Sequence, residues 1–210
     1  MTRPLAVLRP EPGNTATAAR VEALGLVAIR LPLFAIRPLA WTPPDRGRFD
    51  ALLLTSANAV RHAGPGLAAL DLPVVAVGEA TARAARAAGL SVAAVGAGDA
   101  AEAVRLSGSM RLLHLAGRDR TDAGVEAIVV YAADPIAVPD VAPLSGCVAL
   151  LHSVRAARRF AELVERDRVT DLRVAALSPT VRDAGPAVVG AVAERPSDAA
   201  LVALAARLAD

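Results

Sequence analysis

The chain has 210 residues, of which 54% are hydrophobic and 2% aromatic, so its core must be built mainly from Ala, Val and Leu. Its 23 basic residues are all Arg, and they are spread along the chain at a net charge of +2, which argues against a nucleic-acid-binding stripe. The absence of Lys excludes covalent catalysis through a Schiff base, and the scarcity of aromatic residues argues against base stacking.

Nothing in the sequence points to a membrane or secreted protein. The first residues run into a strand-like segment without the apolar region of a signal peptide, and no uncharged apolar run reaches the roughly 18 residues of a membrane span. The single cysteine, Cys147, lies in an apolar run and is expected to be a core residue rather than a nucleophile. We therefore expect a cytoplasmic protein.

Apolar runs alternate with helical patterns along the first half of the chain. The apolar runs predict strands at residues 5–8, 27–31, 51–54, 74–77 and 92–95. Helices are predicted from Asn14 or Thr15 to residue 24, after the capping-type residues 55–58, over residues 81–88 and from Asp99. Residues 33–39 are expected to form an extended connector. This alternation is typical of parallel βαβ units and predicts an α/β fold.

The second half repeats the first. Strands are predicted at residues 112–115, 125–131, 149–151 and 174–177, and a last helix at residues 198–208. Ser153 corresponds to Ser56 and Ser178 to Gly78 at a nearly constant offset, so two units follow one another in the order A-B-A-B, which indicates an internal duplication. The second A unit is shortened, because only residues 120–123 stand where the first copy has a helix.

Polar residues cluster where the predicted strands end. They are Arg9, Thr55, Ser56, Asn58, Gly78, Thr81, Gly117, Arg118, His152, Ser153, Ser178 and Thr180. In an open parallel sheet, ligands bind beyond the carboxyl ends of the strands, and helix N-termini at that edge favour anions. The pattern therefore predicts a cleft between two lobes that takes a large polycarboxylate or a phosphorylated ligand.

Three segments carry a more specific resemblance. They are the run Leu-Thr-Ser-Ala-Asn-Ala-Val at 54–60, the run Val-Gly-Glu-Ala-Thr-Ala-Arg-Ala at 77–84, and Val130-Tyr131. Together they resemble the uroporphyrinogen-III synthase family. The opening at 8–13, Leu-Arg-Pro-Glu-Pro-Gly, is similar to that family's Thr-Arg-Pro start, with Leu8 in place of Thr. The resemblance covers nearly the whole chain.

The resemblance implies two flavodoxin-like lobes with parallel sheets joined by a two-stranded linker. Lobe 1 would take residues 1–35 and 137–210, lobe 2 residues 40–130, with linkers near 33–39 and 130–136. It also implies a lyase of tetrapyrrole and heme biosynthesis that cyclises hydroxymethylbilane to uroporphyrinogen III, inverting ring D through a spiro intermediate and losing water. The family uses no metal or organic cofactor. We expect a monomer whose substrate is handed over by hydroxymethylbilane synthase.

The resemblance also assigns roles to single residues. Tyr131 matches the family's linker tyrosine and would donate a proton or hydrogen bond to the departing hydroxyl, although a half-buried strand tyrosine is the plain alternative. Thr81 would touch the substrate, or it would simply cap a helix. Ser56 and Ser153 match the family's paired Thr-Ser turns, and they too have capping as their alternative role.

The chain departs from the family's pattern in its second half. The second Gly-x-x-Thr turn reads Ser178-Pro179-Thr180-Val181, with Val181 where the threonine usually stands, so Thr180 is the substitute candidate. His152 replaces a threonine and would bind a carboxylate or act as a neutral turn residue. Arg155, Arg158 and Arg159 share a helix face, and Arg155 is nearest the predicted cleft.

Two other function classes stay open. The shortened second A unit and Val181 favour a non-catalytic module of this fold that binds a tetrapyrrole or another anion. A nucleotide-binding protein is suggested by Gly96-Ala97-Gly98, but Ala101 stands where the third glycine belongs. Cys/His spacing for a metal is absent, and no Ser-His-Asp arrangement stands out.

Overall fold

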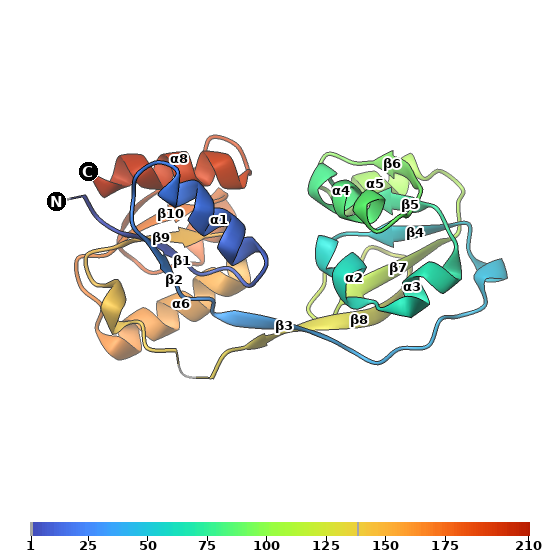
Figure 1. Cartoon of the computed structure of the whole chain (residues 1–210), viewed down its shortest axis with the longest axis horizontal. Coiled ribbons are helices and arrows are strands. Elements are labelled where there is room, and N and C mark those ends of the chain that lie inside the picture. Colours follow the sequence, from blue (N-terminus) through green and yellow to red (C-terminus); the bar gives the residue numbers. More distant parts are fainter. Residues whose placement is uncertain (1, 138) are drawn as a thin grey trace. The chain divides into compact units, whose positions relative to one another are not determined.

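The computed structural model describes residues 2–137 and 139–210, which form two compact units. Lobe 1 consists of Met1–Ala35 and Pro135–Asp210, and lobe 2 is the continuous segment Ile36–Asp134. Each lobe contains its own β-sheet with helices packed against it (Figure 1). The fold is mixed α/β with mostly parallel strands, as the sequence predicts.

Lobe 1 contains a five-stranded parallel sheet in the order β11-β10-β9-β1-β2. Its strands are β1 (Leu5–Val7), β2 (Ala28–Arg30), β9 (Val148–Leu151), β10 (Arg173–Ala176) and β11 (Val189–Val192). Its helices are α1 (Gly13–Glu22), α6 (Val154–Asp167), α7 (Pro179–Asp183) and α8 (Asp198–Ala209), with a 3-10 turn at Ala142–Leu144. Helices α1 and α8 cover one face of the sheet and α6 the other (Figure 1).

Lobe 2 contains a six-stranded sheet in the order β3-β8-β7-β4-β5-β6. Its strands are β3 (Phe34–Pro38), β4 (Ala51–Leu54), β5 (Val74–Ala76), β6 (Val92–Val95), β7 (Leu112–Gly117) and β8 (Glu126–Pro135). Strands β3 and β8 cross the lobe boundary, because Phe34, Ala35 and Pro135 belong to lobe 1. Its helices are α2 (Ala57–His62), α3 (Pro65–Leu70), α4 (Glu79–Ala87) and α5 (Ala100–Leu106), with a 3-10 turn at Arg46–Arg48. The pairs from β8 to β6 are parallel.

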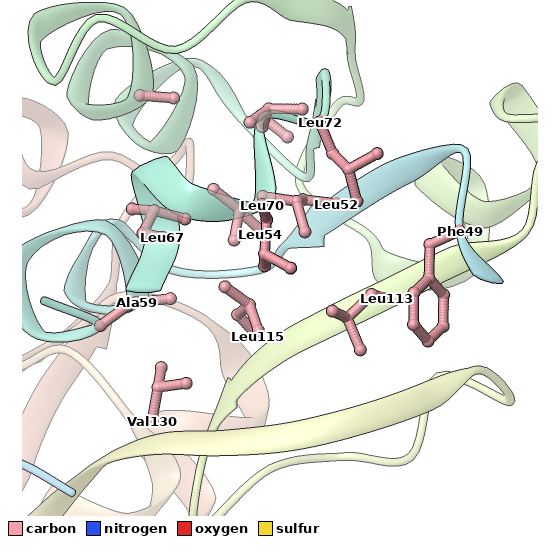
Figure 2. Close-up of a cluster of buried hydrophobic side chains, with 14 of the residues drawn as sticks. Phe49, Leu52, Leu54, Ala59, Leu67, Leu70, Leu72, Leu113, Leu115 and Val130 are labelled. Carbon is pink, nitrogen blue, oxygen red and sulfur yellow. The ribbon is translucent and has the colours of Figure 1, made fainter. Parts of the chain in front are cut away.

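The lobe 2 sheet is buried on both faces. Leu52 and Leu54 point into a core shared with α2, α3 and α4, as Figure 2 shows, and Ala51 and Leu53 point into a second core shared with α5. Because successive side chains of a strand alternate between faces, burial of both faces requires the continuous apolar run that the sequence has here.

Each sheet combines half of one repeat with half of the other. In lobe 1, β1 and β2 from the first A unit join β9, β10 and β11 from the second B unit. In lobe 2, β7 and β8 from the second A unit join β4, β5 and β6 from the first B unit. The lobe 1 sheet thereby has the 2-1-3-4-5 order of flavodoxin-like folds. Five strands of lobe 2 have the same order when they are counted from the A unit, as β7, β8, β4, β5 and β6, and β3 is added at the edge beside β8. The topological switch points lie between β1 and β9 in lobe 1 and between β7 and β4 in lobe 2.

The structure corrects two predicted helix starts. Helix α1 begins at Gly13 after Pro12, and Asn14 does not cap it, because the fully buried Asn14 side chain donates hydrogen bonds to the carbonyls of Val7 and Arg9. Helix α4 has Gly78 at its N-cap, so Thr81 is not a cap either. Helix α3 and strand β11 were not predicted. The shortened second A unit is confirmed, since residues 118–125 contain no helix.

The structure also bears on the cysteine and on membrane-spanning helices. Cys147 is buried in lobe 1, and burial raises the pKa of its thiol, as a core cysteine requires. Across the described residues, no helix combines the length and apolarity that crossing a membrane requires.

Candidate substrate-binding site

Strand β4 of lobe 2 ends in a turn of hydroxyl side chains at the switch point. The Ser56 hydroxyl accepts a hydrogen bond from the Asn58 backbone N–H at 3.1 Å and caps α2. The Thr55 hydroxyl lies 3.0 Å from Nε2 of His114, which projects from the neighbouring strand β7. His114 is 1% exposed, and its burial lowers the pKa of the imidazole, so the ring is neutral at physiological pH.

Strand β5 ends in the second predicted turn of lobe 2. Gly78 occupies the N-cap of α4, and no side chain caps this helix, so its first N–H groups have no side-chain partner among the described residues. Thr81 lies in the first turn of α4, where its backbone N–H donates to the Gly78 carbonyl at 3.0 Å, and it is buried. The turn therefore offers backbone donors at the same edge as Ser56.

Tyr131 lies on strand β8, opposite the carboxyl end of β7. It pairs with Gly117, the last residue of β7, just after a shift in the strand register, and its ring lies directly against that glycine. A Cβ atom at Gly117 would come within 2.7 Å of Cζ and 2.9 Å of the hydroxyl oxygen of Tyr131. The His62 ring is tilted against the Tyr131 ring at a centroid distance of 6.4 Å. The half-buried ring thus has a fixed position, and its hydroxyl makes no hydrogen bond to any described residue.

The carboxyl edge of lobe 1 holds the corresponding turns. The Ser153 hydroxyl caps α6 by accepting from the Ala156 N–H at 3.2 Å, and the Ser178 hydroxyl caps α7 by accepting from the Val181 N–H at 3.4 Å. Thr180 is exposed in the first turn of α7. Capping was the alternative role for Ser56 and Ser153, and the structure shows that both serines do cap.

Arg9 and His152 meet at a carboxylate that the sequence analysis did not single out. Oδ1 of Asp198, in the first turn of α8, lies 2.8 Å from His152 Nε2, 2.7 Å from the Thr17 hydroxyl and 3.3 Å from Arg9 Nη1. Oδ2 of Asp198 accepts from Arg20 Nη1 at 2.5 Å. The only sequence signal was an acidic residue opening a helix, which cannot reveal partners so distant along the chain.

Burial and charge set the protonation of this cluster. Burial lowers the pKa of His152, and the hydrogen bond to Asp198 only partly opposes it, so the imidazole is neutral. Burial raises the pKa of Asp198, but hydrogen bonds from His152 and Thr17 and the charge of Arg9 outweigh it and hold that pKa well below its usual range. Asp198 is therefore ionised, and it stands between two guanidinium groups, those of Arg9 and Arg20.

Other sequence candidates have ordinary structural partners. The Arg155 guanidinium lies 4.4 Å from the centroid of the Phe34 ring, within lobe 1, whereas Arg158 is exposed. In the glycine loop of lobe 2, the Ala97 N–H donates to a carboxylate oxygen of Glu102 at 2.8 Å. The Glu102 carboxylate thus already accepts from a backbone N–H group that a bound phosphate would need, which counts against the nucleotide-binding interpretation. The described residues contain no cluster of His, Cys, Asp and Glu that could hold a metal ion.

Comparisons with known proteins support the family resemblance seen in the sequence. The family model described as uroporphyrinogen-III synthase HemD matches residues 15–203. A crystal structure of uroporphyrinogen-III synthetase from Helicobacter pylori is similar at a TM-score of 0.68 and 18% identity, covering 99% of this chain and 100% of that one. A mutant uroporphyrinogen III synthase from the extremely thermophilic bacterium Thermus thermophilus is similar at a TM-score of 0.55 and 17% identity, covering 97% and 96%.

A search of curated protein sequences finds no match. The two solved structures are too distant in sequence to show more than a shared fold, and they confirm the predicted architecture. The family model matches nearly the whole chain, including the turns that carry Thr55, Gly78 and Ser153 and the strand that carries Tyr131. The chain belongs to the uroporphyrinogen-III synthase family.

Proposed function

We propose that this chain cyclises hydroxymethylbilane to uroporphyrinogen III, with inversion of ring D through a spiro intermediate and loss of water. The observation that carries the proposal is the family match over residues 15–203. The activity is that of a cyclising lyase in porphyrin biosynthesis. We propose further that the protein works in the cytoplasm as a monomer without a cofactor, and that hydroxymethylbilane synthase supplies the substrate.

The reaction demands control of conformation more than strong chemistry. The linear tetrapyrrole carries eight carboxylates and closes on its own to isomer I. Loss of the ring A hydroxyl leaves an electrophilic azafulvene, which ring D must attack through its substituted carbon to give the spiro intermediate. Holding reacting atoms in such a pose contributes up to roughly 7–11 kcal/mol in favourable cases. The protein's main task is therefore to bind the carboxylates in a fixed arrangement.

Backbone amides and hydroxyl groups at the carboxyl edges of both sheets suit this task. Helices α4 and α6 begin at these edges, and a helix N-terminus favours a carboxylate through its N–H groups and its positive dipole end. The candidate binding residues are Arg9, Thr55, Ser56, Asn58, Gly78, Thr81, His152, Ser153, Ser178 and Thr180. Among them, Thr55 and His152 are already engaged by His114 and Asp198, so we propose that these two shape the turns more than they bind substrate directly.

Tyr131 is the proposed proton donor. The departing hydroxyl of ring A needs a proton or a strong hydrogen bond as its C–O bond breaks. The Tyr131 hydroxyl supports this role because it has no hydrogen-bond partner among the described residues, while Gly117 and His62 hold its ring. A fixed ring with an available hydroxyl is the arrangement that general acid catalysis requires.

The isomer ratio of the product tests the proposal. Purified protein is given hydroxymethylbilane freshly made by its own synthase, and the products are oxidised and separated as isomers I and III. An excess of isomer III over a reaction without protein is the expected result. Isomer I alone from folded protein would contradict the synthase activity. Retained binding of tetrapyrrole in that case would identify the non-catalytic module instead.

A further inference from the structure

Asp198 brings together three elements of lobe 1 that are far apart in the sequence. Its carboxylate binds Arg9 from the segment after β1, Thr17 and Arg20 from α1, and His152 from the end of β9. The Thr17 side chain is fully buried and that of Asp198 is 18% exposed, so these contacts lie mostly inside the lobe. The Arg20 contact, at 2.5 Å, is a short charge-assisted hydrogen bond, whereas the Arg9 contact is longer, at 3.3 Å, and attracts Arg9 mainly through charge.

Arg9 is the member of the cluster that remains accessible. Its side chain is 34% exposed, and both hydrogen bonds that it makes to described residues, to Thr17 and Asp198, use Nη1 alone. A guanidinium group has five N–H donors, so Arg9 keeps donors for a further acceptor. The cluster holds one carboxylate between Arg9 and Arg20 with a neutral imidazole, which leaves a surplus positive charge.

Gly13 provides an independent constraint on the same guanidinium. A Cβ atom at Gly13, the first residue of α1, would collide with Nε of Arg9 and lie 2.6 Å from its Cζ. The Arg9 side chain therefore lies flat on the glycine backbone, next to the N-terminus of α1. A cation is unfavourable at that end of a helix unless anions accompany it. The Glu11 carboxylate accepts from the Thr15 N–H in the first turn of α1, and Asp198 is the carboxylate that contacts Arg9 itself.

We propose that Asp198 is a positioning residue that holds Arg9 on Gly13 so that the remaining N–H groups of Arg9 bind a carboxylate of the tetrapyrrole. The inference rests on the proposed function and deepens it, because it names one substrate contact and what fixes it. The opposite arrangement, in which Asp198 competes with the substrate for Arg9, is an outcome of the test.

Two variants displace Arg9 by different routes. Asp198→Asn removes the charge that attracts Arg9, and Gly13→Ala places a methyl group where the guanidinium lies. The matched control is Asp171→Asn, which removes the same kind of ion pair from lobe 1 at Arg3. Asp171 is exposed with φ +51, a conformation that asparagine tolerates well.

Three measurements separate the possible results. Initial rates of isomer III formation give KM and kcat, fluorescence anisotropy of uroporphyrin III gives binding without turnover, and 15N-edited NMR follows the arginine Nε–H groups. We expect both variants to raise KM and the uroporphyrin Kd by about 10- to 100-fold with little change in kcat. The Arg9 signal should shift in both, and the control should match the wild type in every readout.

Each other result has a definite meaning. An unchanged or lower KM in folded Asp198→Asn would overturn the positioning role, and a lower KM would show that Asp198 competes with the substrate. If Asp198→Asn does not fold, Gly13→Ala decides alone, and an unchanged Kd there overturns the proposal. A wild-type protein that makes isomer I only but binds uroporphyrin III more tightly than both variants would refute the synthase activity and leave the role of Asp198 standing.

Discussion

Tyr131 depends on a neighbour that has no side chain. Its ring occupies the space where any other residue at position 117 would place a Cβ atom, and a register shift at the end of the β7–β8 pairing brings the two residues opposite each other. Sequence resemblance marked Tyr131 as the candidate donor, but the contact with Gly117 is visible only in the structure. Tyr131 and Gly117 together therefore determine where the phenol hydroxyl lies.

The first prediction concerns this pair. Tyr131→Phe removes the proposed donor and should lower kcat for isomer III formation by about 10²- to 10⁴-fold, the usual contribution of a general acid. Gly117→Ala keeps the hydroxyl but displaces the ring, so it should also lower kcat. Stopped assays of isomer III measure both, with circular dichroism as the check on folding. A Tyr131→Phe variant with wild-type kcat would show that the hydroxyl takes no part in the chemistry.

A second prediction follows from the buried imidazole of His114. Its pKa is below the ordinary value of about 6.5 because burial disfavours the charged ring, so the unfolded state binds a proton more readily than the folded state. Stability should therefore fall as the pH drops below about 6.5. His114→Gln removes this proton uptake and should lose less stability than the wild type between pH 8 and pH 5 in urea unfolding. Equal losses would contradict the prediction.

The roles of Asn14 and Asp198 could not be predicted from the sequence. Asn14 is a good helix cap by type, yet its side chain is buried and bonded to the backbone on either side of β1's end. Asp198 is an ordinary first-turn acid by position, yet it binds four side chains from elsewhere in lobe 1. The partners of Asp198 are distant in sequence, so no local pattern encodes them. The partners of Asn14 are only five and seven residues away, but the type of residue alone does not distinguish a cap from a side chain that binds the preceding turn.

At the scale of single helices and strands, the local sequence pattern predicted more of the structure than it did for single residues. Strands β4 and β6 have the predicted bounds, because each is an apolar run between polar turns. Strand β4 is buried throughout, whereas neither β6 nor β11 has a buried member, so burial does not separate the predicted strand from the missed one. Strand β11, Val-Gly-Ala-Val, contains a glycine, a residue depleted in strands, and this weakens its signal. Helix α3 is a short segment that begins at Pro65-Gly66, two residues typical of turns.

The third prediction tests a helix cap. Ser153 accepts a hydrogen bond from the third N–H of α6, the longest helix among the described residues. Ser153→Ala should lower the free energy of unfolding of lobe 1 by about 1 kcal/mol, and Ser153→Asp should retain most of it because aspartate also caps. Chemical unfolding followed by far-UV circular dichroism measures the difference. An alanine variant as stable as the wild type would show that the cap contributes little here.

At the scale of the whole molecule, each lobe encloses its own core. Leu5, Val148, Leu150 and Leu201 are buried together in lobe 1, whereas Leu52, Leu54 and Leu115 are buried together in lobe 2. The α/β class and the duplication were predictable from the order of apolar runs. The pairing of β1 with β9 and of β4 with β7 could not be predicted from sequence periodicity, because periodicity gives no information on contacts between distant segments.

The fourth prediction uses the single tryptophan. Trp41 belongs to lobe 2, where its indole N–H donates to the Ala63 carbonyl at 2.7 Å, so its fluorescence reports on that lobe. Phe160 is fully buried in lobe 1, and Phe160→Ala should cost about 3–5 kcal/mol. We expect this variant to shift the circular dichroism transition and leave the Trp41 transition in place. Leu115→Ala should shift the Trp41 transition, and a common shift in Phe160→Ala would reveal one cooperative unit.

The interleaved duplication has a consequence for how the chain is made on the ribosome. Strand β1 is translated before lobe 2, but its neighbour β9 follows only after all of lobe 2, on the order of ten seconds later at ordinary rates of synthesis. Residues from both sides of lobe 2 also meet at the backbone, since the Arg3 N–H donates to the Ala209 carbonyl at 2.9 Å. In a circular permutant that begins at Pro135 and has residues 210 and 1 linked, each lobe would be one continuous segment. Lobe 1 could then fold before lobe 2 is translated.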